Sequence, residues 1–194
     1  WSFISNKNRN NYETKIELIL DLITGKNPNE RDELFTFLKL YRMQNEEVDG
    51  LDEVWKKIQR FYLTLQQWYS DKEYYHKIGY LVASRNFGSY TGIDLNQLVN
   101  YALTETKADF RKKIDSLISE SVNFELSELR YDNQGHHSQI FNALLLSNVV
   151  TCLQSEASIE FYPFKLHKQN KWSFEHIHAR KSENFDQSKR EPWL

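Results

Sequence analysis

The sequence contains few of the residues that break or cross-link a chain. Only six glycines and three prolines occur among 194 residues. A chain so poor in turn-forming residues favours long helices with short connections over a many-stranded sheet. Cys152 is the single cysteine, which excludes a disulfide within the chain and is typical of a cytoplasmic protein. These scarcities predict a mainly α-helical fold.

Membrane-targeting patterns and an excess of positive charge are also missing. No apolar run is long enough to span a bilayer, and the N-terminus lacks the basic-then-apolar pattern of a signal peptide. The formal net charge is -2, so the chain lacks the overall basic field of a dedicated nucleic-acid-binding domain. We therefore predict a protein without membrane contact, whose contacts with DNA, if it makes any, are local.

Large apolar side chains are plentiful. Hydrophobic residues make up 40% of the chain and aromatic residues 14%, which is too much apolar surface for a disordered protein. The length suits one ordinary domain and the edge of a second. The first residue is Trp1 and the only methionine is Met43. We therefore expect an internal piece of a longer protein.

Apolar residues recur at helical spacing along most of the chain. The segments that show this spacing are 12–23, 34–41, 52–69, 74–82, 95–103, 110–118 and 139–153. Gly25 follows the first segment where a helix would end, and Asp71 and Asp94 stand where they can cap the fourth and fifth. The sequence thus predicts a multi-helix domain.

Two of these segments predict the core. Segment 52–69 has the clearest amphipathic stripe, and segment 139–153 is apolar enough to be a central buried helix. Packing is the simplest role for such stripes. The residues that we predict to be core are Trp55, Ile58, Leu65, Leu144 and Leu145.

The character of the chain changes after Ser158. Residues 159–166 mix aromatics with a proline, and residues 171–177 resemble a short strand. We predict a helical domain over residues 1–158 and a second, β-containing segment over residues 159–194. From Pro163 to Arg190 there are seven Lys and Arg residues against three acids. Such a tail could neutralise several phosphates, although a charge run is more often a solvated surface.

Histidines outside this tail favour structural roles. His76 lies among aromatic residues, where a histidine is usually a hydrogen-bonded residue of the core or its rim. His136 and His137 are adjacent, so on a helix their side chains diverge, and no cysteine or acid stands at ligand spacing. We expect them at the exposed start of a helix.

The chemically informative pair is Glu175-His176. A carboxylate next to a histidine suits metal-assisted phosphodiester cleavage, because the carboxylate can hold a divalent cation and the neutral imidazole can take a proton from the attacking water. A regular strand would send the two side chains to opposite faces. This chemistry therefore requires a loop or turn at the pair.

The motif Glu175-His176-Ile177-His178-Ala179, preceded by Trp172-Ser173-Phe174, resembles the start of the HNH (His-Me finger, ββα-metal) nuclease domain in GmrSD-like restriction enzymes. The likeness extends upstream and covers nearly the whole chain. The segments that resemble the central helical region of that family are 1–4, 12–19, 61–69, 74–81 and 144–149.

This resemblance implies a metal-dependent restriction endonuclease acting in the cytoplasm against phage or modified foreign DNA. Glu175 aligns with the metal-binding acid, for Mg²⁺ or Mn²⁺, and His176 with the general base. His178, Arg180 and Lys181 are candidate contacts to DNA phosphates. Ala179 stands where many HNH sequences have proline.

The rest of the family's machinery is implied to lie outside this sequence. A ParB-like domain that hydrolyses nucleotide and senses modified DNA precedes the helical region, but its Asp-Gly-Gln-Gln-Arg signature is absent here. Nucleotide binding is therefore assigned to no residue. The helix that completes the metal site is expected beyond Leu194, so the piece alone is expected to be inactive.

A second hypothesis needs no chemistry. The chain could be a non-enzymatic helical module for protein interaction or oligomerisation, whose aromatic stripes pack inside the domain or against another subunit. Loss of DNA cleavage in a His176→Ala variant of the full-length protein would favour the nuclease.

Overall fold

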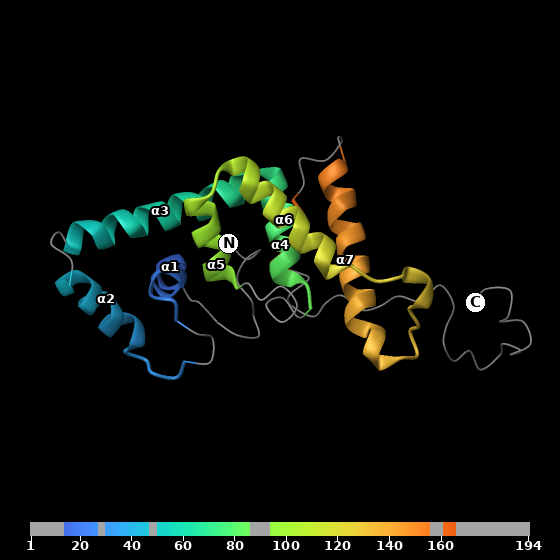
Figure 1. Ribbon diagram of the computed structural model, residues 1–194, viewed down its shortest axis with the longest axis horizontal. Coiled ribbons are helices and arrows are strands. Elements are labelled where there is room, and N and C mark those ends of the chain that lie inside the picture. The colour runs from blue at the N-terminus through green and yellow to red at the C-terminus, as the bar shows by residue number, and fades with distance from the viewer. Residues whose placement is uncertain (1–13, 27–29, 47–49, 86–93, 156–160, 166–194) are drawn as a thin grey trace, which may run out of the picture.

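The computed structural model describes residues 14–26, 30–46, 50–85, 94–155 and 161–165 (Figure 1). Within these residues the chain forms α-helices and two short 3-10 turns, and no strand. The helices are α1 (Lys15–Thr24), α2 (Phe35–Glu46), α3 (Gly50–Ser70), α4 (Lys72–Ala83), α5 (Leu95–Thr104), α6 (Lys107–Ser121) and α7 (His137–Gln154), and the turns are η1 (Leu126–Glu128) and η2 (Gln134–His136). The helical prediction is confirmed. The predicted strand at residues 171–177 lies outside the described residues.

Local hydrogen bonds define several helix ends, as the sequence predicts. The Asp71 carboxylate accepts from N–H groups of the first turn of α4. Asp94 accepts from the N–H of Gln97, whose side chain in return accepts from the N–H of Asp94. These bonds satisfy donors that the first helical turn leaves unpaired. Gly25 ends α1 with φ 65°, a left-handed conformation that glycine adopts without strain.

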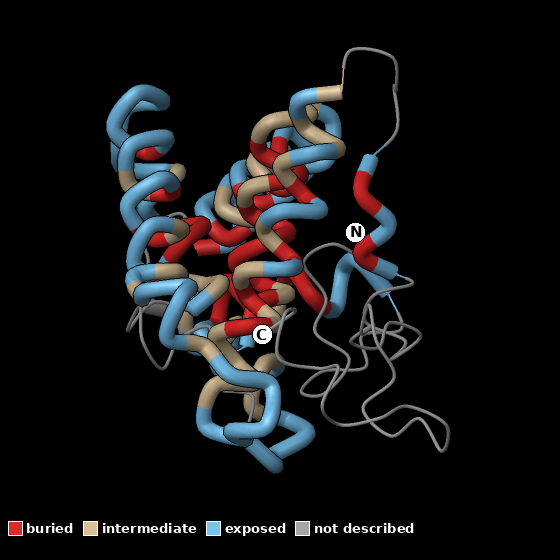
Figure 2. Tube along the Cα trace, turned by 90° about the vertical axis from the view of Figure 1, so that its right-hand side faces the viewer, coloured by how far each residue is buried: buried red, intermediate tan, exposed pale blue. Residues whose placement is uncertain are grey.

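The helices form an elongated body around α3 and α4. Helix α3 contacts α1, α2, α4 and α5, and α4 contacts α3, α6 and α7. In Figure 1, α1 and α2 lie below the N-terminal half of α3, and α7 stands towards the opposite end of the molecule. Figure 2 shows the buried residues gathered between the helices. Among the described residues, no helix is both long and apolar enough to cross a membrane.

The core predictions for α3 are correct in part. Leu65 is fully buried, and Ile58 is partly buried and packs against the core. Trp55 was expected in the core, but 58% of its surface is exposed. Its neighbour Val54 faces the core instead, and consecutive helical residues point about 100° apart. The covered face of α3 thus overlaps the predicted stripe at Leu65 and Ile58 but does not include Trp55.

The prediction for α7 is also corrected. Leu145 is buried, but Leu144 is 41% exposed, and α7 is a peripheral helix rather than a central one. Helix α7 packs on α4 with one face, which includes Leu145 and Val149 of the core cluster. Because α7 carries apolar residues on several sides, its sequence could not indicate which side would be covered.

These neighbours provide a matched test of the fold. Leu145→Ala is expected to lower the free energy of unfolding by about 2–5 kcal/mol, because it leaves a cavity between α7 and α4. Leu144→Ala removes the same atoms from a half-exposed position, so its effect should be clearly smaller. Chemical denaturation of both variants would measure the difference. Equal losses would contradict the packing described for α7.

Candidate functional site

The predicted nuclease residues lie outside the described part of the chain. They are Glu175, His176, His178, Arg180 and Lys181. Their assignments stay predictions. The described residues closest to them in sequence are 161–165, which fall on the C-terminal side of the predicted domain boundary. The way the helical body holds this short segment, here called the anchor segment, is therefore the structural feature closest to the predicted chemistry.

Two consecutive residues of α4 hold the backbone of Tyr162. The hydroxyl of Tyr75 donates a hydrogen bond to the carbonyl oxygen of Tyr162 (3.0 Å). The N–H of Tyr162 donates to Nε2 of His76 (3.1 Å). Tyr162 is almost completely buried, and buried backbone groups need such partners. Burial raises the pKa of Tyr75 to about 12, so its hydroxyl remains a donor at neutral pH.

The environment of His76 selects one tautomer. Nδ1 lies 2.7 Å from the carbonyl oxygen of Lys72, so Nδ1 carries the proton and Nε2 is the acceptor that Tyr162 uses. Burial lowers the pKa of His76, and the hydrogen bond to the Lys72 carbonyl opposes this shift only in part. The interpretation of His76 as a hydrogen-bonded core histidine is confirmed.

Aromatic rings cover one side of the anchor segment. Phe161 stacks on the ring of His76, with centroids 6.0 Å apart and planes 10° from parallel. It also stacks on Tyr69 at the end of α3 (6.5 Å, 4°) and meets Tyr75 edge-on at 4.7 Å. The anchor segment therefore packs against the end of α3 as well as against α4.

Phe164 inserts where α4 has no side chain. Its ring is fully buried, and a Cβ atom placed on Gly79 would lie 2.3 Å from a carbon of that ring. Glycine costs a helix about 1 kcal/mol relative to alanine. Its presence inside α4 is explained by this close approach, and not by a turn, because α4 continues regularly through Gly79.

The sequence reasoning did not find this anchor. One signal was available, because a glycine inside a strongly helical segment often marks a close approach of another group. The partner could not be inferred, since His76 and Tyr162 are separated by 86 positions in the chain. Only the tertiary structure brings them together.

The anchor predicts a pH dependence of stability. His76 has a folded-state pKa below the ordinary value of about 6.5, so the unfolded chain binds the proton more readily. Its contribution to stability should be complete above about pH 6.5 and should be lost as pH falls towards the lowered pKa. Protonation would also turn Nε2 into a donor facing the N–H of Tyr162.

Denaturation at a series of pH values from 5 to 8 would test this expectation. A His76→Gln variant offers an amide oxygen as acceptor but cannot titrate, so it should lose part of the acid sensitivity. If wild type and variant lost stability in parallel between pH 6.5 and 5, another group would be responsible.

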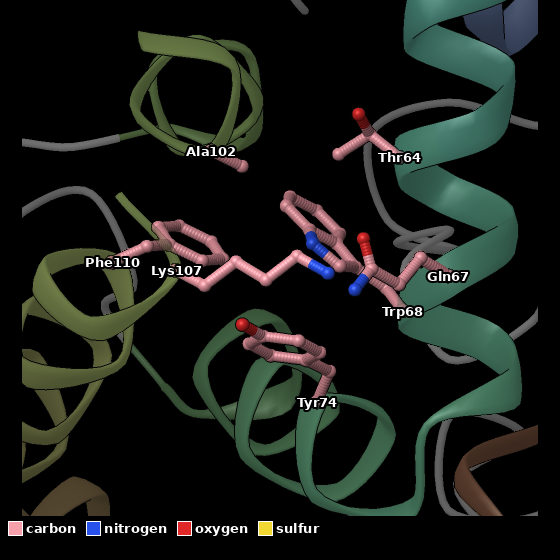
Figure 3. Close-up of a pocket in the computed structure, with 7 residues that line it drawn as sticks. All are labelled: Thr64, Gln67, Trp68, Tyr74, Ala102, Lys107 and Phe110. Atoms are coloured by element: carbon pink, nitrogen blue, oxygen red, sulfur yellow. The ribbon is translucent and has the colours of Figure 1, made fainter. Parts of the chain in front are cut away.

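A small pocket opens where α3, α4, α5 and α6 meet (Figure 3). Its volume is about 50 Å³, and it is lined by Thr64, Gln67, Trp68, Tyr74, Ala102, Lys107 and Phe110. Trp68 and Phe110 stack at 5.7 Å and form an aromatic wall. Sites for cofactors and substrates usually exceed about 300 Å³. This pocket has room for a few water molecules and is not a candidate active site.

The remaining described histidines organise a turn. His136 accepts from the N–H of Arg130 through Nδ1 (3.1 Å), and Nε2 of His137 lies 2.9 Å from the carbonyl oxygen of Tyr131. Within the described ranges, no group of three or more His, Cys, Asp or Glu side chains is arranged to hold a metal ion.

Comparisons of this chain with models of protein families, with curated proteins and with solved structures find no match.

Proposed function

We propose that this chain is the helical part of a metal-dependent restriction endonuclease that cuts modified foreign DNA, and that its helices hold the start of the HNH nuclease domain. The sequence resemblance to GmrSD-like enzymes motivates the proposal. The observation that carries it furthest is the anchor, because α4 fixes the chain by Tyr162 shortly before the Glu175-His176 pair.

The anchor limits how far the predicted pair can lie from the helical body. Ten peptide units separate Lys165 from Glu175. A fully extended chain advances at most about 3.5 Å per residue, so Glu175 stays within roughly 35 Å of the anchored end. A nuclease domain that began there would be tied closely to α4.

The proposed chemistry assigns one role to each member of the pair. Neutral His176 would take a proton from the water that attacks the phosphodiester. The Glu175 carboxylate would hold Mg²⁺ or Mn²⁺, ions that prefer oxygen ligands. A bound ion would stabilise the charge that develops on the leaving oxygen. One carboxylate is only part of an octahedral ligand set, so further ligands must come from outside this pair.

The basic residues around the pair fit a nucleic-acid substrate. His178, Arg180 and Lys181 follow it directly, within a stretch where cations outnumber acids by seven to three. Such residues would neutralise phosphates beside the scissile bond, and their contribution would weaken as salt increases. The modified base would be sensed elsewhere in the longer protein, by the ParB-like domain that the resemblance implies.

Metal-dependent cleavage tests the proposal. The full-length protein should cut modified plasmid DNA when Mg²⁺ or Mn²⁺ is present and should stop cutting when EDTA removes the ion. The 194-residue chain should not cut under the same conditions, because one carboxylate and one imidazole leave the ion weakly bound and the water poorly placed. A full-length protein without metal-dependent cleavage on any modified DNA would refute the nuclease assignment.

One observation favours the alternative, a helical interaction module. Helix α2 packs on α1 and α3, with Leu40 and Met43 against the core. A second apolar stripe on α2 is exposed, and it consists of Leu34, just before the helix, with Phe37, Leu38 and Tyr41. A helix with apolar residues on opposite faces is typical of one that is covered on both. The interaction module would be supported if the full-length protein folded, did not cleave DNA and bound a protein partner through this stripe.

A further inference from the structure

The anchor segment is held to the helical body through hydrogen bonds of Tyr162 and through aromatic rings. The carbonyl oxygen of Tyr162 accepts from Tyr75, and its N–H donates to Nε2 of His76. Within the segment, the N–H of Phe164 donates to the carbonyl oxygen of Tyr162 (2.8 Å), which closes a turn of three residues. One of the groups that hold this short piece of chain, the His76 ring, can take up a proton near neutral pH.

Both ring nitrogens of His76 are committed while the anchor segment is in place. Nδ1 donates to the carbonyl oxygen of Lys72, and Nε2 accepts from the N–H of Tyr162. The ring is fully buried, and Phe161 stacks on it. A second proton would have to sit on Nε2, where it would point at the N–H of Tyr162. His76 can therefore become doubly protonated only when Tyr162 moves away.

The charges around His76 disfavour a second proton as well. The Lys72 ammonium lies on the same helix, where its charge opposes the imidazolium, and it donates to the carbonyl oxygen of Ser155 at the end of α7 (3.1 Å). The anchor segment itself adds another cation, Lys165. The remaining titratable side chains around the ring are neutral near pH 7, and they are Tyr69 of α3, Tyr75 of α4, Cys152 of α7 and Tyr162.

The acids of the neighbouring helices do not compensate. Helix α7 contains no acidic residue. At the start of α4, Asp71 caps the helix, and Glu73 pairs with Lys77 and with Arg111 of α6. Among the described residues, the surroundings of His76 therefore favour its neutral form as long as the anchor segment is bound.

We propose that the anchor segment is a pH-sensitive latch, in which uptake of one proton by His76 accompanies release of residues 161–165 from α4. Release removes Phe161 from the face of the ring and Tyr162 from Nε2, so water can reach the imidazole. The latch makes the hold of α4 on the chain that continues towards Glu175 sensitive to pH. It does not depend on the nuclease assignment.

The size of the effect follows from the linkage between release and protonation. Burial lowers the pKa of His76 while the segment is bound, and after release the ring should titrate near its ordinary pKa of about 6.5. The equilibrium constant for release should therefore be constant well above that pH and should rise as the pH falls below it. From about pH 7.5 to about pH 5.5 the expected increase is about tenfold. Carboxylates with ordinary pKa values near 4 stay charged across this range.

Contacts away from the anchor segment keep α4 in place during release. Helix α4 packs on α3, α6 and α7. Ion pairs join Glu73 to Arg111 and Lys77 to Asp115 of α6. None of these contacts involves residues 161–165, so release should be a local opening that requires less free energy than unfolding of the domain.

Amide hydrogen exchange of the 194-residue chain, measured by NMR from pH 7.5 to 5.5, tests the latch. The N–H of Tyr162 donates to His76, so it exchanges only after release. Its protection factor, corrected for the intrinsic exchange rate at each pH, should fall about tenfold over this range. At every pH it should also be lower than that of Ile114, a fully buried residue of α6 that reports unfolding of the domain. Equal protection of the two amides, or a Tyr162 protection factor that does not change with pH, would overturn the proposal.

Three variants assign the pH dependence to His76. His76→Gln offers an acceptor that cannot titrate, so the protection of Tyr162 should become independent of pH. His137→Gln makes the same change at a histidine that contacts the carbonyl oxygen of Tyr131, and it should keep the tenfold fall. Phe161→Ala should lower the protection of Tyr162 by the same factor at every pH, because the lost ring does not titrate. A His76→Gln variant that folds and retains the tenfold fall would show that another group operates the latch and would refute the proposal.

Discussion

In the full-length protein, His176→Ala is expected to lower the rate of metal-dependent DNA cleavage by about 10²–10⁴-fold, the range usual for removal of a general base. The substitution deletes the group assigned to deprotonate the attacking water and leaves the metal-binding carboxylate in place. DNA binding should therefore be retained, and the loss should fall on the chemical step. Single-turnover cleavage of modified DNA would measure it.

Two further variants sharpen this test. Glu175→Gln keeps the size of the side chain but removes the charge that holds the metal ion. The cleavage activity of this variant should therefore recover in part when the concentration of Mn²⁺ is raised, whereas that of His176→Ala should not. His136→Ala makes the same chemical change at a histidine of the turn before α7 and should keep most of the activity. Wild-type cleavage by His176→Ala would show that the base is a different residue.

The second large effect is expected at the anchor, where Phe164→Ala should lower the free energy of unfolding by about 3–5 kcal/mol. The ring is fully buried against α4, so its removal leaves a cavity beside Gly79. Gly79→Ala should also destabilise the protein, by about 1–3 kcal/mol, because the new methyl group would overlap the ring. Chemical denaturation would measure both.

The two substitutions should be strongly coupled. In a Phe164→Ala background the methyl group at position 79 has room, and alanine is the better helix former, so Gly79→Ala should then be neutral or stabilising by up to about 1 kcal/mol. Gly135→Ala is a control, because its nearest neighbour is a side-chain oxygen of Asn133 at 3.1 Å in an exposed turn. Additive effects of the two substitutions would mean that Phe164 does not lie on Gly79.

If the anchor positions the nuclease segment, substitutions in the anchor should also affect DNA cleavage. Gly79→Ala in the full-length protein should reduce cleavage while leaving the Glu175-His176 pair intact. Raising the metal concentration should not restore this loss, because the variant changes where the pair is held and not what it binds. If the Gly79→Ala variant cleaved DNA at the wild-type rate, the anchor would have only a structural role.

The sequence by itself determined where the described helices lie and how several of them end. Helical spacing depends on neighbours three and four positions away, and the bonds of Asp71 and Asp94 reach only two or three residues along the chain. Such local interactions form in the same way whatever surrounds the helix. The Glu175-His176 assignment likewise comes from the sequence and its resemblance to a family, and it lies outside the described residues.

The tertiary structure decided which side of each helix is covered. Trp55 and Leu144 have the spacing of core residues, yet both are exposed, because the other helices pack against neighbouring faces of α3 and α7. The anchor is likewise a tertiary feature, since His76 meets Tyr162 across 86 positions. Burial and long-range hydrogen bonds depend on how helices are placed against one another, and that placement is a property of the whole chain that no single segment encodes.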